Sequence, residues 1–169
     1  MLLTEHEGKL LLAQTGLQTP QGQLISLDSL EAFSFPDTCM IKAQVLHGNR
    51  AMNGLVTKAT SAQEAKAVAT EMATKTDMYG VPFTHVLIEE LTTFSDQWYV
   101  ALRYDTSSRK LVCDVSNQGG VGMDDRGDSV VTTELSVLAP PDSFEAFPDL
   151  LPVIKQLWQV FTTNDAVLV

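Results

Sequence analysis

The sequence has little cysteine, and this shortage excludes two classes of protein. Its 169 residues include two cysteines, Cys39 and Cys113. Two cysteines are too few for the disulfide framework of a small secreted domain, and they lack the spacing of a zinc site. Both lie in or beside apolar stretches, "DTCMIK" and "KLVCDV". We therefore expect reduced cysteines in a core rather than a disulfide.

Basic residues are also scarce, and long apolar runs are missing. The 11 lysines and arginines face 21 aspartates and glutamates, which gives a formal net charge of −10. Broad binding of nucleic acid or anionic membrane needs a basic surface. No stretch approaches the ~18 apolar residues of a membrane span, and the start has no secretory signal. We expect a cytoplasmic protein that binds neither nucleic acid nor membrane, although a few local cations could still hold a small anion.

Helical and strand-like patterns alternate irregularly along the chain. Thr4 and Glu7 form a capping-box pattern before a helix expected over 5–15, which Gly16 would end. Ser61 is an expected N-cap for the alanine-rich segment that follows, and a third helix is expected over 147–161. The expected strands are "QLISL", "TCMIKAQVL", "NGLVTKAT", "THVLIEEL", the hairpin "QWYVALRYD" with "KLVCDVS", and the terminal "DAVLV". This order predicts an α+β fold, mostly antiparallel, with a cleft between two lobes. A buried strand at the very end would suggest a domain that continues beyond Val169.

Lys42 and Arg50 are the first candidate site residues. Lys42 interrupts the apolar run "TCMIKAQVL", and Arg50 follows in the loop "HGNRAMNG". Lys42 could be an edge-strand lysine that points to solvent. Alternatively, both cations could project into a cleft and bind phosphate oxygens, because the fork of arginine donors suits such an anion.

The acidic candidates are also open to two interpretations. Glu89 and Glu90 end the strand "THVLIEEL", either as solvated acids or as a hinge that contacts a nucleoside. The loop "NQGGVGMDDRGD" carries three aspartates, but their spacing does not fit a calcium loop. It could be a flexible solvent loop, or its Gly119-Gly120 pair could allow another backbone or a ligand to approach closely. The three histidines have no evident carboxylate partner, so nucleophilic catalysis is set aside.

Four segments in one order are together similar to a known family. They are "TEHEGKLLLAQTGLQTPQG", "MIKAQVLHGNRAMNGLV", "HVLIEELTTFSDQWYVALRYDTSSRKLV" and "NQGGV". The chain resembles the ATP-grasp domain of the succinyl-CoA synthetase β subunit and of ATP-citrate lyase, which are nucleoside-diphosphate-forming acyl-CoA synthetases. The resemblance implies one ATP-grasp domain over 1–169, incomplete at its C-terminus, with ATP held between two lobes.

The family's chemistry is the ligation of a carboxylic acid to coenzyme A, driven by ATP through a phosphohistidine. The resemblance implies that this histidine belongs to a partner, a CoA-binding α-type subunit or domain, so a hetero-oligomer is expected. It also implies Mg2+, whose ligands are expected beyond Val169. No catalytic residue and no metal ligand is assigned within the chain.

The resemblance assigns nucleotide contacts to seven residues. Lys42 matches the lysine on the phosphates, and Glu89 matches the hinge glutamate. The others are Asn49, Arg50, Ala51, Thr92 and Gln97. Three of these depart from the family: Asn49 and Ala51 replace glycines that flank the arginine, and Gln97 replaces a glutamate.

These departures leave two hypotheses. The chain could be the ATP-binding part of an ADP-forming acid–CoA ligase, with a citrate-specific relative as an alternative to a succinate-specific one. It could instead be a degenerate ATP-grasp-like module, retained to bind a partner without catalysis.

Overall fold

The computed structural model describes residues 1–119 and 130–169. The chain divides into two compact units. Unit 1 contains Met1–Leu10 and Thr19–Thr93, and unit 2 contains Leu11–Gln18 and Phe94–Val169. The first helix, α1 (Glu5–Gln14), contributes its first half to unit 1 and its second half to unit 2. In the described part of the chain, no helix is both long enough and apolar enough to span a membrane.

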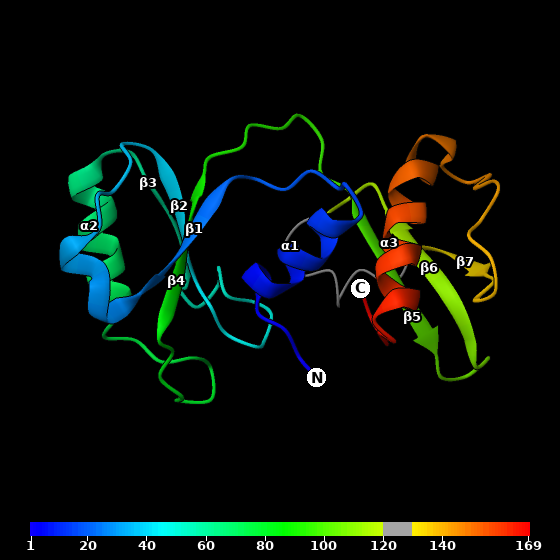
Figure 1. Cartoon of the computed structure of the whole chain (residues 1–169), viewed down its shortest axis with the longest axis horizontal. Helices are drawn as coiled ribbons and strands as arrows, with labels where there is room; N and C mark the ends of the chain where they lie inside the picture. Colours follow the sequence, from blue (N-terminus) through cyan, green and yellow to red (C-terminus); the bar gives the residue numbers. More distant parts are fainter. Residues whose placement is uncertain (120–129) are drawn as a thin grey trace. The chain divides into compact units, whose positions relative to one another are not determined.

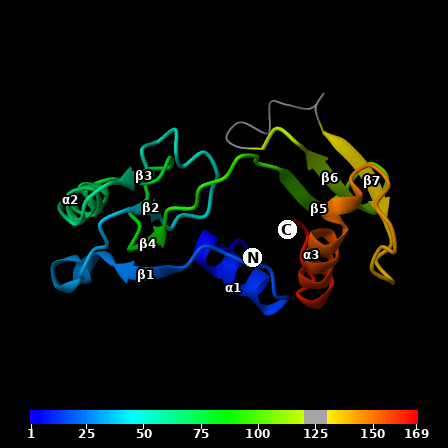
Figure 2. The same ribbon diagram turned by 90° about the horizontal axis from the view of Figure 1, so that it is seen from above.

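Unit 1 is built on a four-stranded antiparallel sheet in the order β1-β4-β2-β3. The strands are β1 (Gly22–Ser26), β2 (Cys39–Ala43), β3 (Val56–Ala59) and β4 (His85–Glu90), and a short 3-10 helix, η1 (Leu27–Ala32), follows β1. Helix α2 (Ala62–Met72) covers one face of this sheet (Figure 2). Sheet and helix enclose one apolar core.

The period-2 alternation of β2 decides which side chains reach this core. Cys39 and Ile41 are fully buried and belong to the same apolar cluster as Ala65 and Met72 of α2. Successive strand residues point to opposite faces, so Lys42 lies on the face away from α2. Because β2 lies between β4 and β3, the alternative of a solvent-facing edge lysine is wrong.

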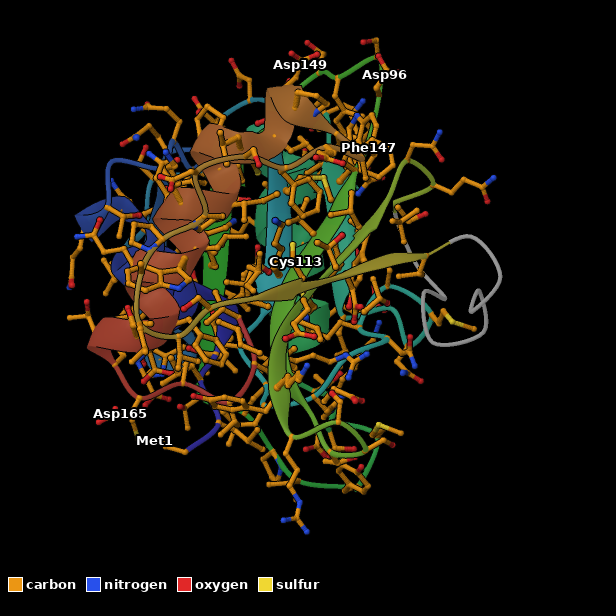
Figure 3. All side chains as sticks on the ribbon, turned by 90° about the vertical axis from the view of Figure 1, so that its right-hand side faces the viewer. Met1, Asp96, Cys113, Phe147, Asp149 and Asp165 are labelled. Atoms are coloured by element: carbon orange, nitrogen blue, oxygen red, sulfur yellow. The ribbon has the colours of Figure 1, made fainter. Side chains whose placement is uncertain are left out.

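Unit 2 contains a three-stranded antiparallel sheet in the order β5-β6-β7 (Figure 1). The strands are β5 (Tyr99–Asp105), β6 (Lys110–Ser116) and β7 (Val131–Leu135). A 3-10 turn, η4 (Pro148–Leu150), leads into α3 (Leu151–Thr163). Figure 3 labels Cys113, which lies on the middle strand and packs with Ile154, Leu157 and Phe161 of α3. Both cysteines are free and buried, as expected.

The local sequence signals for the helices are confirmed. The Thr4 N–H donates to Glu7 Oε2 at 2.8 Å, and the Glu7 N–H donates to Thr4 Oγ1 at 3.4 Å, which is the capping box. Gly16 follows α1 with a φ of +80°, and Ser61 accepts a hydrogen bond from the Glu64 N–H at 3.2 Å. The third helix begins at Leu151, four residues later than expected, because Pro148 first forms the 3-10 turn.

Other expectations are modified by the structure. Strand β7 is missing from the sequence prediction, although "VVTTEL" is rich in β-branched residues. The expected terminal strand pairs with β5 through Leu102 and Val169, yet Val167 and Leu168 are exposed rather than buried. The three aspartates of the Gly-rich loop lie outside the described residues. Before them, a Cβ on Gly119 would meet the Gln97 backbone at 2.8 Å, so another backbone does approach closely there.

Candidate functional site

Lys42 lies in the centre of the unit 1 sheet and binds two carboxylates. Lys42 pairs with Leu87 of β4, and Met40, two residues earlier on β2, pairs with Glu89. Lys42 and Glu89 are therefore diagonal neighbours on the same face of the sheet. The Lys42 Nζ donates to Glu89 Oε2 at 2.5 Å and to Glu5 Oε1 at 2.8 Å. The Lys42 side chain is 17% exposed and the Glu89 side chain only 2%. The interpretation of Glu89 as a solvated acid is therefore wrong.

Arg50 reaches the same cluster from the loop after β2. Its Nη1 donates to the Ala43 carbonyl at 3.2 Å, and its Nη2 donates to Glu5 Oε2 at 2.6 Å. The Glu5 carboxylate thus binds Lys42 with one oxygen and Arg50 with the other. The two cations that the sequence singles out lie on either side of one carboxylate.

Neighbouring charges set the protonation of Glu5 and Lys42. Burial alone would raise the pKa of Glu5, but hydrogen bonds from Lys42 and Lys9, together with the charges of Lys42 and Arg50, lower it to about 2. Burial would lower the pKa of Lys42, and the two carboxylates instead raise it. Glu5 and Lys42 are both charged over the physiological pH range.

Three residues of the cluster are missing from the sequence prediction: Glu5, Lys9 and Gln44. Lys9 pairs with Glu5 at 2.7 Å and also with Glu89. Gln44 is buried; its Oε1 accepts the His6 N–H at 2.9 Å, and its Nε2 donates to the Lys42 carbonyl at 3.0 Å. The four-residue spacing of Glu5 and Lys9, which places both on one helix face, is the signal that could have found two of them.

The loop around Arg50 is a compact turn. Asn49 has a φ of +56°, a left-handed conformation that asparagine tolerates better than most residues other than glycine. The Arg50 carbonyl accepts hydrogen bonds from the Asn53 N–H at 3.1 Å and the Leu55 N–H at 2.9 Å. Asn49 and Ala51 are both exposed. Asparagine therefore supplies the backbone geometry of a glycine while adding a Cβ at the surface.

The remaining two predicted contacts lie outside this cluster. Thr92 is exposed and follows the end of β4 in unit 1, whereas Gln97 is exposed and belongs to unit 2. The Gln97 carbonyl accepts the Gly119 N–H at 2.9 Å. Lys42, Arg50 and Glu89 are thus brought together within one unit, and the assignment of all seven residues to nucleotide contacts stays a prediction.

The arrangement favours an anionic ligand. Three cations, Lys9, Lys42 and Arg50, face two carboxylates, Glu5 and Glu89, so the cluster carries a net charge of +1 in a chain whose net charge is −10. A partly exposed lysine and an arginine with forked donors are the side chains that bind phosphate oxygens.

Comparison with known proteins identifies the family. A family profile described as an ATP-grasp domain matches residues 2–130. The chain belongs to the ATP-grasp family of succinyl-CoA synthetase β subunits, ATP-citrate lyase and ADP-forming acyl-CoA synthetases. A curated relative, the β subunit of the ADP-forming succinate–CoA ligase of Desulfurococcus amylolyticus, is 33% identical over 129 residues. That alignment covers 74% of the chain and 34% of the relative, so the chain spans about a third of the length of this relative.

Solved structures share the fold of the chain. ATP citrate lyase from Methanothrix soehngenii, in complex with citrate and coenzyme A, matches with a TM-score of 0.69 at 21% identity, covering 99% of the chain and 45% of that protein. Ca. Korarchaeum cryptofilum ACD1, in complex with coenzyme A, matches with a TM-score of 0.64 at 18% identity, covering 99% and 83%. The α+β fold with antiparallel sheets is therefore the expected ATP-grasp fold.

Proposed function

We propose that the chain is the nucleotide-binding part of an ADP-forming acid–CoA ligase, and that its Lys42–Arg50 cluster binds the phosphates of ATP. The observation that carries the proposal is the convergence of Lys42 and Arg50 on the two oxygens of one carboxylate, at 2.8 and 2.6 Å. A phosphate group also presents neighbouring anionic oxygens. The same pair of donors can therefore bridge two phosphate oxygens.

Each residue of the cluster has a distinct role in this proposal. Lys42 and Arg50 neutralise the phosphates and fix their orientation, which is the main task of a protein in phosphoryl transfer. Glu89 holds the Lys42 ammonium in place from the neighbouring strand. The tight turn at Asn49 orients Arg50 toward the sheet. Thr92 and Gln97 complete the nucleotide contacts.

The relatives supply the rest of the reaction. The matched proteins are named as a succinate–CoA ligase β subunit and as enzymes in complex with coenzyme A. By this likeness, the chain places the terminal phosphate of ATP for transfer to a histidine on a CoA-binding α-type subunit or domain. None of the chain's own histidines takes that role.

The described residues contain no candidate magnesium site. In residues 1–119 and 130–169, no group of three or more histidines, cysteines, aspartates and glutamates could hold a metal ion. No step in this chain is assigned to Mg2+. Lys42 and Arg50 bind and orient the phosphates.

Thermal unfolding with and without ATP tests the proposal. A ligand at about a hundred times its Kd stabilises the folded state by ~2.7 kcal/mol, so millimolar ATP should raise the Tm of the wild-type chain. Lys42→Met should abolish the rise, because the phosphates lose their central cation.

Lys66→Met is the matched control. Lys66 also pairs with a glutamate in unit 1, Glu31 at 2.7 Å, but this pair is exposed and lies outside the cluster. The control should keep the full ATP-dependent rise. A wild-type chain whose Tm does not respond to millimolar ATP, or a Lys42→Met variant that responds like the wild type, contradicts the proposal.

A further inference from the structure

Glu5 holds the position on Lys42 and Arg50 that the proposed function gives to a phosphate. Its two oxygens accept from Lys42 Nζ at 2.8 Å and from Arg50 Nη2 at 2.6 Å, and Lys9 adds a third cation at 2.7 Å. A ligand phosphate that binds both cations needs the same donors. Two anions on one pair of cations also repel each other.

Glu5 is attached to the sheet by polar contacts. In α1, which is fully described, no residue is buried, and Leu10 is 54% exposed. The first turn is held by the ion pairs of Glu5 and Lys9 and by the hydrogen bond from the His6 N–H to Gln44. Release of this turn therefore exposes no buried apolar side chain. It breaks polar contacts, and a phosphate that takes the place of Glu5 would restore the anionic partner of Lys42 and Arg50.

We propose that Glu5 is an internal competitor for the ligand: its carboxylate occupies the phosphate position on Lys42 and Arg50 and is displaced, with the first turn of α1, when a polyphosphate binds. The inference rests on the proposed function, since it assumes that these two cations bind phosphate. When a phosphate replaces Glu5, the cations of the cluster still have anionic partners. Lys42 keeps Glu89, and Lys9 keeps Glu89 as well.

Binding of inorganic tripolyphosphate and of ATP to variants of the whole chain tests the inference. Glu5→Gln removes the competing charge and nearly preserves the side-chain shape, so both ligands should bind about tenfold more tightly than to wild type. Glu31→Gln removes an exposed carboxylate of unit 1 and should leave both Kd values unchanged. Equal or weaker binding to a folded Glu5→Gln variant overturns the inference, because it would make Glu5 a positioning residue instead.

Hydrogen exchange on the wild-type chain provides a test that needs no variant. The His6 amide is protected by Gln44, so saturating tripolyphosphate should speed its exchange several-fold if the first turn is released. Unchanged or slower exchange at saturation overturns the inference. If ATP and tripolyphosphate both fail to bind wild type and Glu5→Gln, the proposed function fails as well. If they bind wild type and Lys42→Met loses them, the proposed function stands whatever Glu5 does.

Discussion

Gly22 of β1 lies directly opposite Glu89 of β4 in the antiparallel β1–β4 pair. A Cβ on Gly22 would stand 3.2 Å from the Glu89 Cβ and 3.0 Å from the Ile88 carbonyl oxygen. Both distances are shorter than ordinary contacts, and the carbonyl belongs to the backbone. Glycine at position 22 therefore lets Glu89 sit close to β1.

Gly22→Ala should destabilise the protein by about 1–2 kcal/mol, because overpacking forces the backbone of β4 to shift. Gly8→Ala is the control: nothing lies within 4 Å of a Cβ there, and the site is inside α1. An alanine inside a helix should stabilise it by about 0.5–1 kcal/mol. Urea unfolding of the two variants measures the contrast, and equal effects of the two substitutions would contradict this account of Gly22.

Lys42→Met should also lower stability without any ligand. Removing one partner of a buried ion pair costs about 3–5 kcal/mol, and the partial exposure of Lys42 with the remaining Lys9 pair reduces this to about 2 kcal/mol. Lys66→Met breaks a pair whose side chains are 43% and 84% exposed, which should cost at most about 1 kcal/mol. Chemical denaturation of both variants compares the two losses; a Lys42→Met variant as stable as Lys66→Met would refute the strong coupling of this cluster.

Acid should destabilise the fold through Glu5. The folded-state pKa of Glu5 is about 2, below its ordinary value of 4.5, so the unfolded chain binds more protons between these two pH values. The stability that Glu5 contributes is complete above about pH 4.5 and is lost as pH falls toward 2. Hydrogen bonds from Ser108, and then from Arg103, lower the pKa of Asp105 to about 2. Asp105 therefore adds to the same loss of stability in acid.

Denaturant unfolding from pH 5 to pH 2.5 measures this loss. Glu5→Gln should show a shallower fall of stability with pH than wild type, since it has no carboxylate to protonate. Glu31→Gln, which removes an exposed carboxylate, should keep the wild-type slope. Parallel curves for wild type and Glu5→Gln would rule out the part assigned to Glu5.

The two thiols should be inert in the folded protein. Burial, and then the charge of Asp114, raises the pKa of Cys113 to about 12, and burial also raises the pKa of Cys39. Both side chains have no exposed surface. A thiol reagent such as dithionitrobenzoate should therefore label neither at pH 8 without denaturant and both in guanidinium chloride. Fast labelling of the folded chain would show that one core opens readily.

Local sequence signals predicted most of the elements, because capping boxes, N-caps and period-2 alternation act over a few residues. Strand β7 was missed, although its β-branched residues are a local signal that could have found it. The ion pairs of Glu5 were also beyond reach: Lys42 and Arg50 lie 37 and 45 residues away from it along the chain. The family resemblance named Lys42, Arg50 and Glu89, but not the carboxylate between the two cations.

Strand order explains why Lys42 could be mistaken for an edge residue. From the sequence, β2 and β3 form a simple hairpin in which the outer edge of β2 is free. In the structure, β4, which comes more than forty residues after β2, pairs with that edge, and β1 pairs with the other edge of β4. Non-local pairing of this kind depends on side-chain packing over the whole sheet, so no local pattern predicts it.

The same order has a consequence for synthesis on the ribosome. Strand β4 is the last strand of its sheet to be made, yet among the described strands it alone links β1 to the β2–β3 pair. Until Glu90 has left the exit tunnel, β1 and β2 each present an unpaired edge, and Lys42 lacks one of its two acids. A nascent chain stalled before that residue should therefore be protease-sensitive and prone to association, and chaperones that shield strand edges should bind it best in this interval.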